Sequence, residues 1–351
     1  MNKSIIFYDS TTNLINPKDK VFDNKNLVEI FIESNESIDQ VLSKAINGNL
    51  IITEFTNIII PACFGDVLSD FLGLRFASHI RCTPGINQES NIFLYSFTRI
   101  QDYFSNECFN ILRTKGVCLI NYDVETILNA VNSSKKYLLK EDLIDEVAKL
   151  KIDVPLNYED NHSIANEWAI YRWANTINTF DNDITKIEYK LENDLYYKYL
   201  KTIYPVNKIE TIDSVDLQLD FEGNPTVLYI DDEAEKGWKE IFSKIIMDVN
   251  KIDFIHLDNE FNGKSKSEIV DISINEVIKE EVDLVILDFR LCNEDFDCTV
   301  IQDITGYQIL KKIKEHNKGV QVIVFSATNK IWNLQALQEA GVDGFIIKES
   351  P

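Results

Sequence analysis

The C-terminal third of the chain alternates short apolar runs with segments whose apolar residues recur at helical spacing. The apolar runs cover residues 225–230, 251–257, 282–288, 320–325 and 344–347. The helical segments between them cover residues 235–249, 267–280, 306–315 and 333–340. Nearly continuous apolar strands that alternate with helices predict a parallel sheet covered on both faces. The predicted fold class is therefore α/β, with a doubly wound, flavodoxin-like sheet of five strands.

A helical region precedes this domain. Residues 124–221 are rich in Lys, Glu, Tyr and Trp, and their clearest helical patterns cover 161–178 and 183–204. This pattern predicts a helical connector domain between two α/β domains. We therefore expect domain boundaries at residues 1–123, 124–221 and 222–351.

The first 123 residues repeat the order of segments in the last domain. Residues 4–9, 57–61, 73–81 and 91–96 follow one another as do residues 226–231, 284–288, 306–314 and 321–326. Self-similarity of this kind indicates a degenerate copy of the last domain, and an unrelated α/β domain is the alternative.

Charged and hydroxyl side chains stand where strands of the last domain end: Asp231 and Asp232 after the first, Asp288 after the third, Ser326 after the fourth and Lys348 after the last. The carboxyl ends of parallel strands lie at one edge of a sheet, where such folds carry their sites. Three carboxylates there suit Mg²⁺, which prefers oxygen ligands. A divalent cation would neutralise the two anions that meet when a carboxylate attacks a phosphoryl group. Lys348 could pair with phosphoryl oxygens, and Ser326 could donate a hydrogen bond to another.

Residues 227–348 resemble the receiver domain of bacterial response regulators, which carries an acidic pair, an aspartate phosphoacceptor, a Ser or Thr, and a Lys in this order. The resemblance implies that a histidine kinase or a phosphotransfer protein phosphorylates Asp288. It also implies that Mg²⁺ binds to Asp231, Asp232, Asp288 and the backbone carbonyl of Arg290. Such a domain catalyses only its own phosphorylation, so the resemblance does not predict an enzyme that turns over a substrate.

The same resemblance assigns the residues that respond to phosphorylation. Ser326 and Ala327 would contact the phosphoryl group beside Lys348, and Phe345 would be the aromatic switch residue. Output is expected through a downstream protein partner, or the domain serves as a phosphate relay or sink. A second copy of the chain, in a homodimer, is a further expected type of partner.

Three features depart from the receiver pattern. The loop 291–305 after the phosphoacceptor is longer and more acidic than usual. Glu349 follows Lys348, where the family has a proline. The chain stops at Pro351, before the usual last helix, which indicates either a truncation or a replacement of that surface by the helical middle region.

The N-terminal copy lacks the phosphorylation residues. Pro61 occupies the phosphoacceptor position, Asp9 is followed by Ser10 rather than by a second acid, and no lysine ends the run 119–122. If the copy is real, it is a pseudo-receiver used for binding or for dimerisation.

The composition and charge of the chain argue against two classes of partner, nucleic acids and membranes. Acidic residues outnumber basic ones 57 to 35, giving a formal charge of −22. Nucleic-acid surfaces need clustered Lys and Arg, so no nucleic-acid partner is expected. No signal peptide and no apolar run long enough to span a membrane is visible, so we expect a cytoplasmic protein without a membrane partner.

Two other classes of function remain open. One is a phosphatase of the haloacid dehalogenase type, which also forms an aspartyl phosphate with Mg²⁺. That class needs a second acid two residues after the nucleophile, where this chain has Arg290. The other is a scaffold whose receiver domain is inactive.

Overall fold

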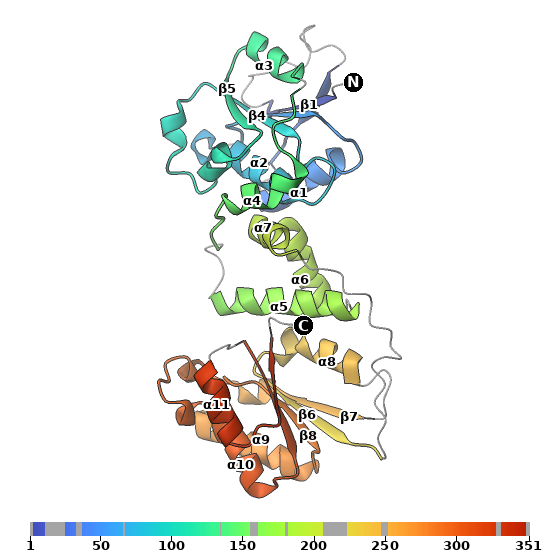
Figure 1. Ribbon diagram of the computed structural model, residues 1–351, viewed down its shortest axis with the longest axis vertical. Coiled ribbons are helices and arrows are strands. Elements are labelled where there is room, and N and C mark those ends of the chain that lie inside the picture. The colour runs from blue at the N-terminus through green and yellow to red at the C-terminus, as the bar shows by residue number, and fades with distance from the viewer. Residues whose placement is uncertain are drawn as a thin grey trace. The chain divides into compact units, whose positions relative to one another are not determined.

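The computed structural model describes residues 3–10, 25–32, 37–65, 67–133, 135–154, 161–179, 182–205, 223–246, 252–327 and 331–348, without the side chains of 161–163, 182–183 and 331–334. The chain forms two compact units (Figure 1). The N-terminal unit comprises Met1–Asn157 and Tyr189–Val206, and the C-terminal unit comprises Tyr158–Glu188 and Asn207–Pro351. The helices of the middle region are therefore divided between the two units, and the boundaries 1–123, 124–221 and 222–351 stay a prediction.

The C-terminal unit contains a five-stranded parallel sheet with the order β10-β9-β8-β6-β7. The strands are β6 (Thr226–Ile230), β7 (Asp253–Leu257), β8 (Leu284–Leu287), β9 (Gln321–Ser326) and β10 (Gly344–Ile347). The first strand lies inside the sheet, between the second and the third, which is the flavodoxin-like, doubly wound order. The predicted fold class is confirmed.

Alternating strand residues cover the two faces of this sheet, because successive side chains of a strand point to opposite sides. On one face, Leu228, Val285 and Val322 join a buried cluster with α9 (Lys266–Lys279) and α10 (Thr305–His316). On the other face, rings gather beneath α8 (Trp238–Ile246): the Phe325 ring centroid lies 4.8 Å from that of Trp238 and 5.0 Å from that of Phe242. The remaining helices of this unit are α11 (Ile331–Glu339) and α5 (Asn161–Ile177), and α5 contacts α8.

The N-terminal unit repeats this topology. Its five-stranded sheet has the order β2-β1-β3-β4-β5. The strands are β1 (Ser4–Tyr8), β2 (Asn26–Glu29), β3 (Asn57–Pro61), β4 (Asn91–Ser96) and β5 (Val117–Asn121). The helices are α1 (Ile38–Asn49), α2 (Leu72–Cys82), α3 (Val124–Val131), α4 (Leu143–Ala148) and α7 (Leu195–Ile203).

Two glycines show how closely the two units correspond. The Gly73 amide donates to the carbonyl of Ala62 at 3.1 Å, and the Gly306 amide donates to that of Phe289 at 3.2 Å. A Cβ atom at Gly73 would lie 2.7 Å from Ala62 Cα, and one at Gly306 would lie 2.6 Å from the carbonyl oxygens of Asp288 and Phe289. Both helices therefore begin against the end of the third strand, where only glycine fits.

The predicted helix 183–204 was wrong as a single element. It consists of α6 (Asn182–Asn193) and α7, separated at Asp194, whose backbone is extended with φ −75° and ψ 133°. A tertiary contact accompanies the break: the amide of Leu195 donates to Asp39 Oδ2 at 2.9 Å. The helix predicted at 161–178 is confirmed as α5. Within the described ranges, every helix is too short or too polar to cross a bilayer.

Candidate functional site

The ends of β6 and β8 bring three carboxylates together. These strands are neighbours, and the Asp288 amide donates to the carbonyl of Ile230 at 2.8 Å. Carboxylate oxygens of Asp231, Asp232 and Asp288 all lie within 4.8 Å of one another. Asp231 and Asp288 are buried, with 0% and 5% of their surface exposed, whereas Asp232 is exposed. The cluster therefore has a buried floor and one acid open to solvent.

Lys348 reaches the same cluster from the end of β10. Its Nζ donates to Asp231 Oδ2 at 2.8 Å and to Asp288 Oδ2 at 3.2 Å. Only 2% of the residue is exposed, and its backbone amide donates to the carbonyl of Ser326 at 3.0 Å. The ammonium lies 5.6 Å from the centre of the Phe325 ring, so it is held between carboxylates and an aromatic wall.

Other donors fix the buried carboxylates. The Tyr229 hydroxyl donates to Asp231 Oδ2, and the Glu233 amide donates to Asp231 Oδ1 at 2.8 Å. The Phe289 amide donates to Asp288 Oδ1 at 2.7 Å. Tyr229 was missed in the sequence, although it lies two positions before Asp231 and so shares its side of the strand.

The gathering of like charges in a buried place shifts the pKa values. Burial raises the pKa of Asp288; Lys348 lowers it, and Asp231 raises it further. Desolvation and then the charges of Asp231 and Asp288 raise the pKa of Asp232 to about 8. Because Asp232 is exposed, we attribute most of that shift to its charged neighbours. Burial acts to lower the pKa of Lys348, but Asp231 and Asp288 raise it above the ordinary value.

This donor set fits Mg²⁺. Oxygens bound to an octahedral ion at 2.0–2.1 Å lie about 3–4.2 Å apart, close to the limit of 4.8 Å that the three carboxylates meet. The side chain of Arg290 is directed to a ring instead: its guanidinium lies 5.1 Å from the centre of the Phe296 ring. Arg290 would therefore join a metal only through its backbone carbonyl.

The residues predicted to respond to phosphorylation lie on the neighbouring strands. Ser326 ends β9 and is 4% exposed, while Ala327 follows it and is half-buried. Phe345 lies on β10, in register with Val324, and packs against the core from a half-buried position. Residues 328–330 and Glu349, the departure from the family's proline, lie outside the described residues.

A buried acid organises the long loop that follows the phosphoacceptor position. Asp295 is 0% exposed and pairs with Lys266 Nζ at 2.8 Å. Its carboxylate accepts the amides of Leu291 at 3.0 Å and Thr305 at 3.1 Å, and the Thr305 hydroxyl at 3.0 Å. The loop 291–305 is therefore tied at both ends to one buried carboxylate.

The corresponding place in the N-terminal unit contains no phosphoacceptor. Pro61 ends β3, and the Tyr103 hydroxyl bonds to the hydroxyls of Ser96 and Thr98 in a buried cluster. The amide of Tyr122 donates to the carbonyl of Ser96 at 2.9 Å, just as that of Lys348 donates to Ser326. Tyr122 thus occupies the backbone position that Lys348 has in the C-terminal unit. The hydroxyl of Tyr103 binds Ser96, the counterpart of Ser326, which in the C-terminal unit would donate to a phosphoryl group.

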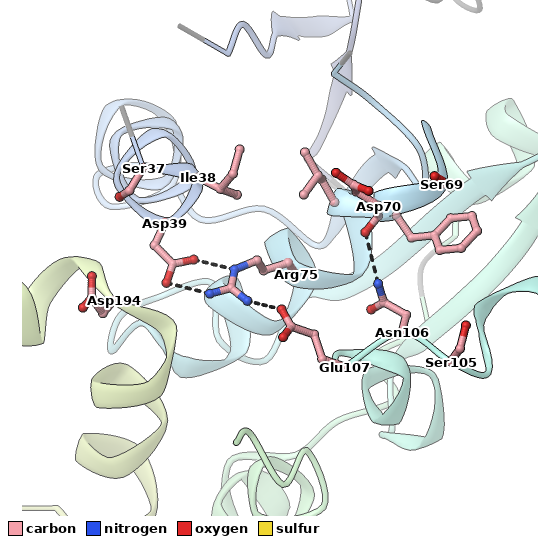
Figure 2. Close-up of a pocket in the computed structure, with 12 residues that line it drawn as sticks. Ser37, Ile38, Asp39, Ser69, Asp70, Arg75, Ser105, Asn106, Glu107 and Asp194 are labelled. Carbon is pink, nitrogen blue, oxygen red and sulfur yellow. Dashed lines mark hydrogen bonds and ion pairs between the residues drawn. The ribbon is translucent and has the colours of Figure 1, made fainter. Parts of the chain in front are cut away.

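The N-terminal unit also has a cavity of about 670 Å³ at the starts of α1, α2 and α7. Figure 2 shows Arg75 in its wall, bound on both sides by acids. Its Nη2 donates to Asp39 Oδ2 at 2.8 Å, and its Nη1 pairs with Glu107. With Asp70 and Asp194 also in the wall, the only guanidinium among the lining residues is already neutralised, so the cavity does not suit an anion.

Comparisons with known proteins match both units. The family described as Inactive Receiver domain matches residues 10–120, and the family described as Response regulator receiver domain matches residues 268–351. The second match includes Asp288, Ser326 and Lys348 and begins after the acidic pair. A search of curated proteins found no match. The chain thus combines an inactive receiver domain with a response regulator receiver domain, as the sequence predicted.

Solved structures of response regulators are similar at low identity. A LuxR-family two-component response regulator from Aurantimonas sp. SI85-9A1 is 14% identical over 36% of this chain and 76% of that one, with a TM-score of 0.28. The receiver domain of RcsB from Salmonella enterica serovar Typhimurium is 18% identical over 37% and 80%, with a TM-score of 0.27. Chemotaxis protein CheY4 of Vibrio cholerae is 14% identical over 37% and 90%, with a TM-score of 0.28.

Proposed function

We propose that this chain, which carries a receiver domain of the two-component response regulators, accepts a phosphoryl group on Asp288 with Mg²⁺ bound beside it. The observation that carries the proposal is the cluster of three carboxylates within 4.8 Å of one another, two of them bound by the ammonium of Lys348. Asp288 is the nucleophile, and Asp231, Asp232 and the carbonyl of Arg290 complete the metal site.

The charges of the site suit this reaction. A bound divalent cation supplies positive charge to the acidic cluster, which keeps Asp288 ionised as a nucleophile and offsets the charge of the incoming phosphoryl group. Lys348 Nζ donates to Asp288 Oδ2 and would donate to the phosphoryl oxygens instead once the ester forms. Ser326 ends the adjacent strand and would donate to the remaining oxygen, beside Ala327.

The donor is a phosphohistidine of a kinase or of a phosphotransfer protein. The response is a change in the loop after Ser326 and in the position of Phe345, which alters contacts with a downstream protein or passes the phosphoryl group on. The N-terminal inactive receiver serves protein contact, including contact with a second copy. The protein acts in the cytoplasm and requires no nucleic acid.

The test is labelling by acetyl phosphate in the presence of Mg²⁺. We expect the wild-type protein to gain one phosphoryl group that is labile to base and to hydroxylamine, detected by intact mass, and the Asp288→Asn variant to gain none. Asp271→Asn is the matched control, because this exposed acid on α9 pairs with Lys312 at the surface, away from the three carboxylates. Labelling of Asp288→Asn at the wild-type rate would refute the proposal.

The same samples separate this function from a phosphatase. A haloacid dehalogenase-type enzyme would hydrolyse p-nitrophenyl phosphate continuously, whereas a receiver forms one ester per chain. We expect no sustained turnover, because Arg290 stands where that class has its second acid. A wild-type protein that neither labels nor binds Mg²⁺ would instead be an inactive scaffold.

A further inference from the structure

Helix α5 presents three side chains on one face toward the surroundings of Asp288. Asn166, Ile170 and Trp173 are spaced by four and three positions, so they lie along the same side of the helix. The helix belongs to the same compact unit as the sheet and packs beside α8 (Figure 1). All three residues contact groups that border the candidate site.

Trp173 holds the backbone of Lys348. Its Nε1 donates to the carbonyl oxygen of Lys348 at 2.6 Å. Its ring centroid lies 5.8 Å from that of Phe325 and 6.5 Å from that of Trp238, both edge to face. Because the amide of Lys348 is bound to Ser326, the lysine is fixed through its N–H by β9 and through its C=O by α5.

Asn166 binds two other residues that border the site. Its Oδ1 accepts from Trp238 Nε1 at 2.7 Å in a buried position, and its Nδ2 donates to Glu233. Glu233 in turn donates its amide to Asp231, and the ring of Trp238 lies 5.7 Å from the ammonium of Lys348. One side chain of α5 is therefore linked both to the acidic pair and to the aromatic wall behind the lysine.

Ile170 packs between these two contacts along the helix. It is 0% exposed and lies over Gly237, where a Cβ atom would be 3.1 Å from Ile170 Cγ2. Gly237 has φ +125°, a conformation that favours glycine. The turn after β6 therefore leaves α5 little freedom to shift without moving the segment that carries Asp231 and Asp232.

We propose that α5 is part of the phosphoacceptor site and that its Trp173 is the positioning residue for Lys348. The inference rests on the proposed phosphorylation of Asp288. The indole N–H fixes the end of β10, so the ammonium stays where it reaches Asp288 and, in the ester, the phosphoryl oxygens. Without that donor the carbonyl of Lys348 is released, and the ammonium samples a wider range of positions.

The test compares two Trp→Phe variants of the full chain on the same helix. Trp173→Phe keeps an aromatic ring but removes the donor, whereas Trp168→Phe changes a half-buried ring that stacks on Tyr171 at 5.7 Å. Labelling by acetyl phosphate gives the rate, and calorimetry gives the affinities for Mg²⁺ and for beryllofluoride, an analogue of the phosphoryl group.

We expect Trp173→Phe to lower the labelling rate and the beryllofluoride affinity by roughly five- to ten-fold, the usual effect of one lost hydrogen bond in a buried site. The Mg²⁺ affinity should not fall, because the ammonium of Lys348 is not a metal ligand and competes with the cation for Asp231 and Asp288. Trp168→Phe should behave as the wild type. Equal behaviour of the two variants, or a parallel loss of Mg²⁺ affinity and thermal stability in Trp173→Phe, would overturn the inference.

The wild-type protein separates this inference from the proposed function. If it is not labelled and binds no beryllofluoride, the phosphoacceptor proposal itself fails. If it is labelled normally and Trp173→Phe is labelled at the same rate, only the role of α5 is refuted.

Discussion

Replacing Gly306 with alanine tests how closely α10 begins against the phosphoacceptor strand. The new Cβ atom would lie 2.6 Å from the carbonyl oxygens of Asp288 and Phe289 and 2.8 Å from Phe289 Cα. These are backbone atoms and cannot rotate away as the end of a side chain could. The start of the helix, the end of the strand, or both must therefore move.

The magnitude is a balance of two terms. Overpacking against immobile atoms costs about 1–3 kcal/mol. Alanine gains back up to ~1 kcal/mol over glycine inside a helix. The net loss of stability is about 1–2 kcal/mol, which lowers the unfolding midpoint of a unit of this size by roughly 2–8 °C. Labelling of Asp288 should also slow, because its own carbonyl is displaced.

Tryptophan fluorescence makes the assay specific to the C-terminal unit, because all four tryptophans of the chain, Trp168, Trp173, Trp238 and Trp332, belong to it. Gly48→Ala is the control, followed by circular dichroism because Gly48 lies in α1 of the N-terminal unit; nothing is within 4 Å of the added methyl group, so this change should be neutral or stabilising. An unchanged fluorescence midpoint in Gly306→Ala would show that the strand and helix do not meet as described.

Three further changes test the buried polar groups. Burial lowers the pKa of His79 to about 4, so near pH 6.5 the unfolded chain binds a proton that the folded unit does not bind. The stabilisation is present above that pH and falls by roughly 1–2 kcal/mol between pH 7 and 5. Circular dichroism should show a smaller loss of stability over this range for His79→Gln. Tyr103→Phe removes one hydrogen-bond partner of the Ser96 hydroxyl and should lower the free energy of unfolding, followed by circular dichroism, by ~1 kcal/mol. The labelling rate of the C-terminal unit should not change. A stability equal to that of the wild type would contradict the bond between Tyr103 and Ser96. Asp295→Asn removes the buried carboxylate that pairs with Lys266 and should lower the fluorescence-monitored stability by ~2–3 kcal/mol. The exposed Asp303→Asn should change it by less than ~0.5 kcal/mol, and similar values for both would exclude a structural role for the buried acid.

The sequence predicted the site best where strand patterns decide it. A run of apolar residues shows where a parallel strand ends, and the fold places all such ends at one edge, so Asp231, Asp288 and Lys348 could be placed near one another without coordinates. The same reasoning found the duplication, because Gly73 and Gly306 stand at matching steps after the third strand. Position along a strand is a local property, and the sequence records it directly.

Contacts between distant segments were not visible. Helical periodicity predicted α5, but nothing in the pattern shows that it packs against α8 or that Trp173 binds a backbone carbonyl. Tyr103 lies in a short turn without a motif, yet its hydroxyl occupies the inactive site. The interruption at Asp194 follows from a hydrogen bond to Asp39, which is 156 positions away from Leu195. In each case the partner is chosen by tertiary packing, which local propensity does not encode.

The bond between Trp173 and Lys348 has a consequence for biosynthesis, because it joins residues 175 positions apart. At a synthesis rate of about 5–20 residues per second, the indole of α5 leaves the ribosome about 10–35 s before the carbonyl that it binds. Over that interval Ile170 and Trp173 lack the partners that they contact in the folded unit, and these apolar side chains are open to chaperones. The C-terminal unit therefore completes its folding only after Lys348 has been made, even though one of its helices is made before any of its strands.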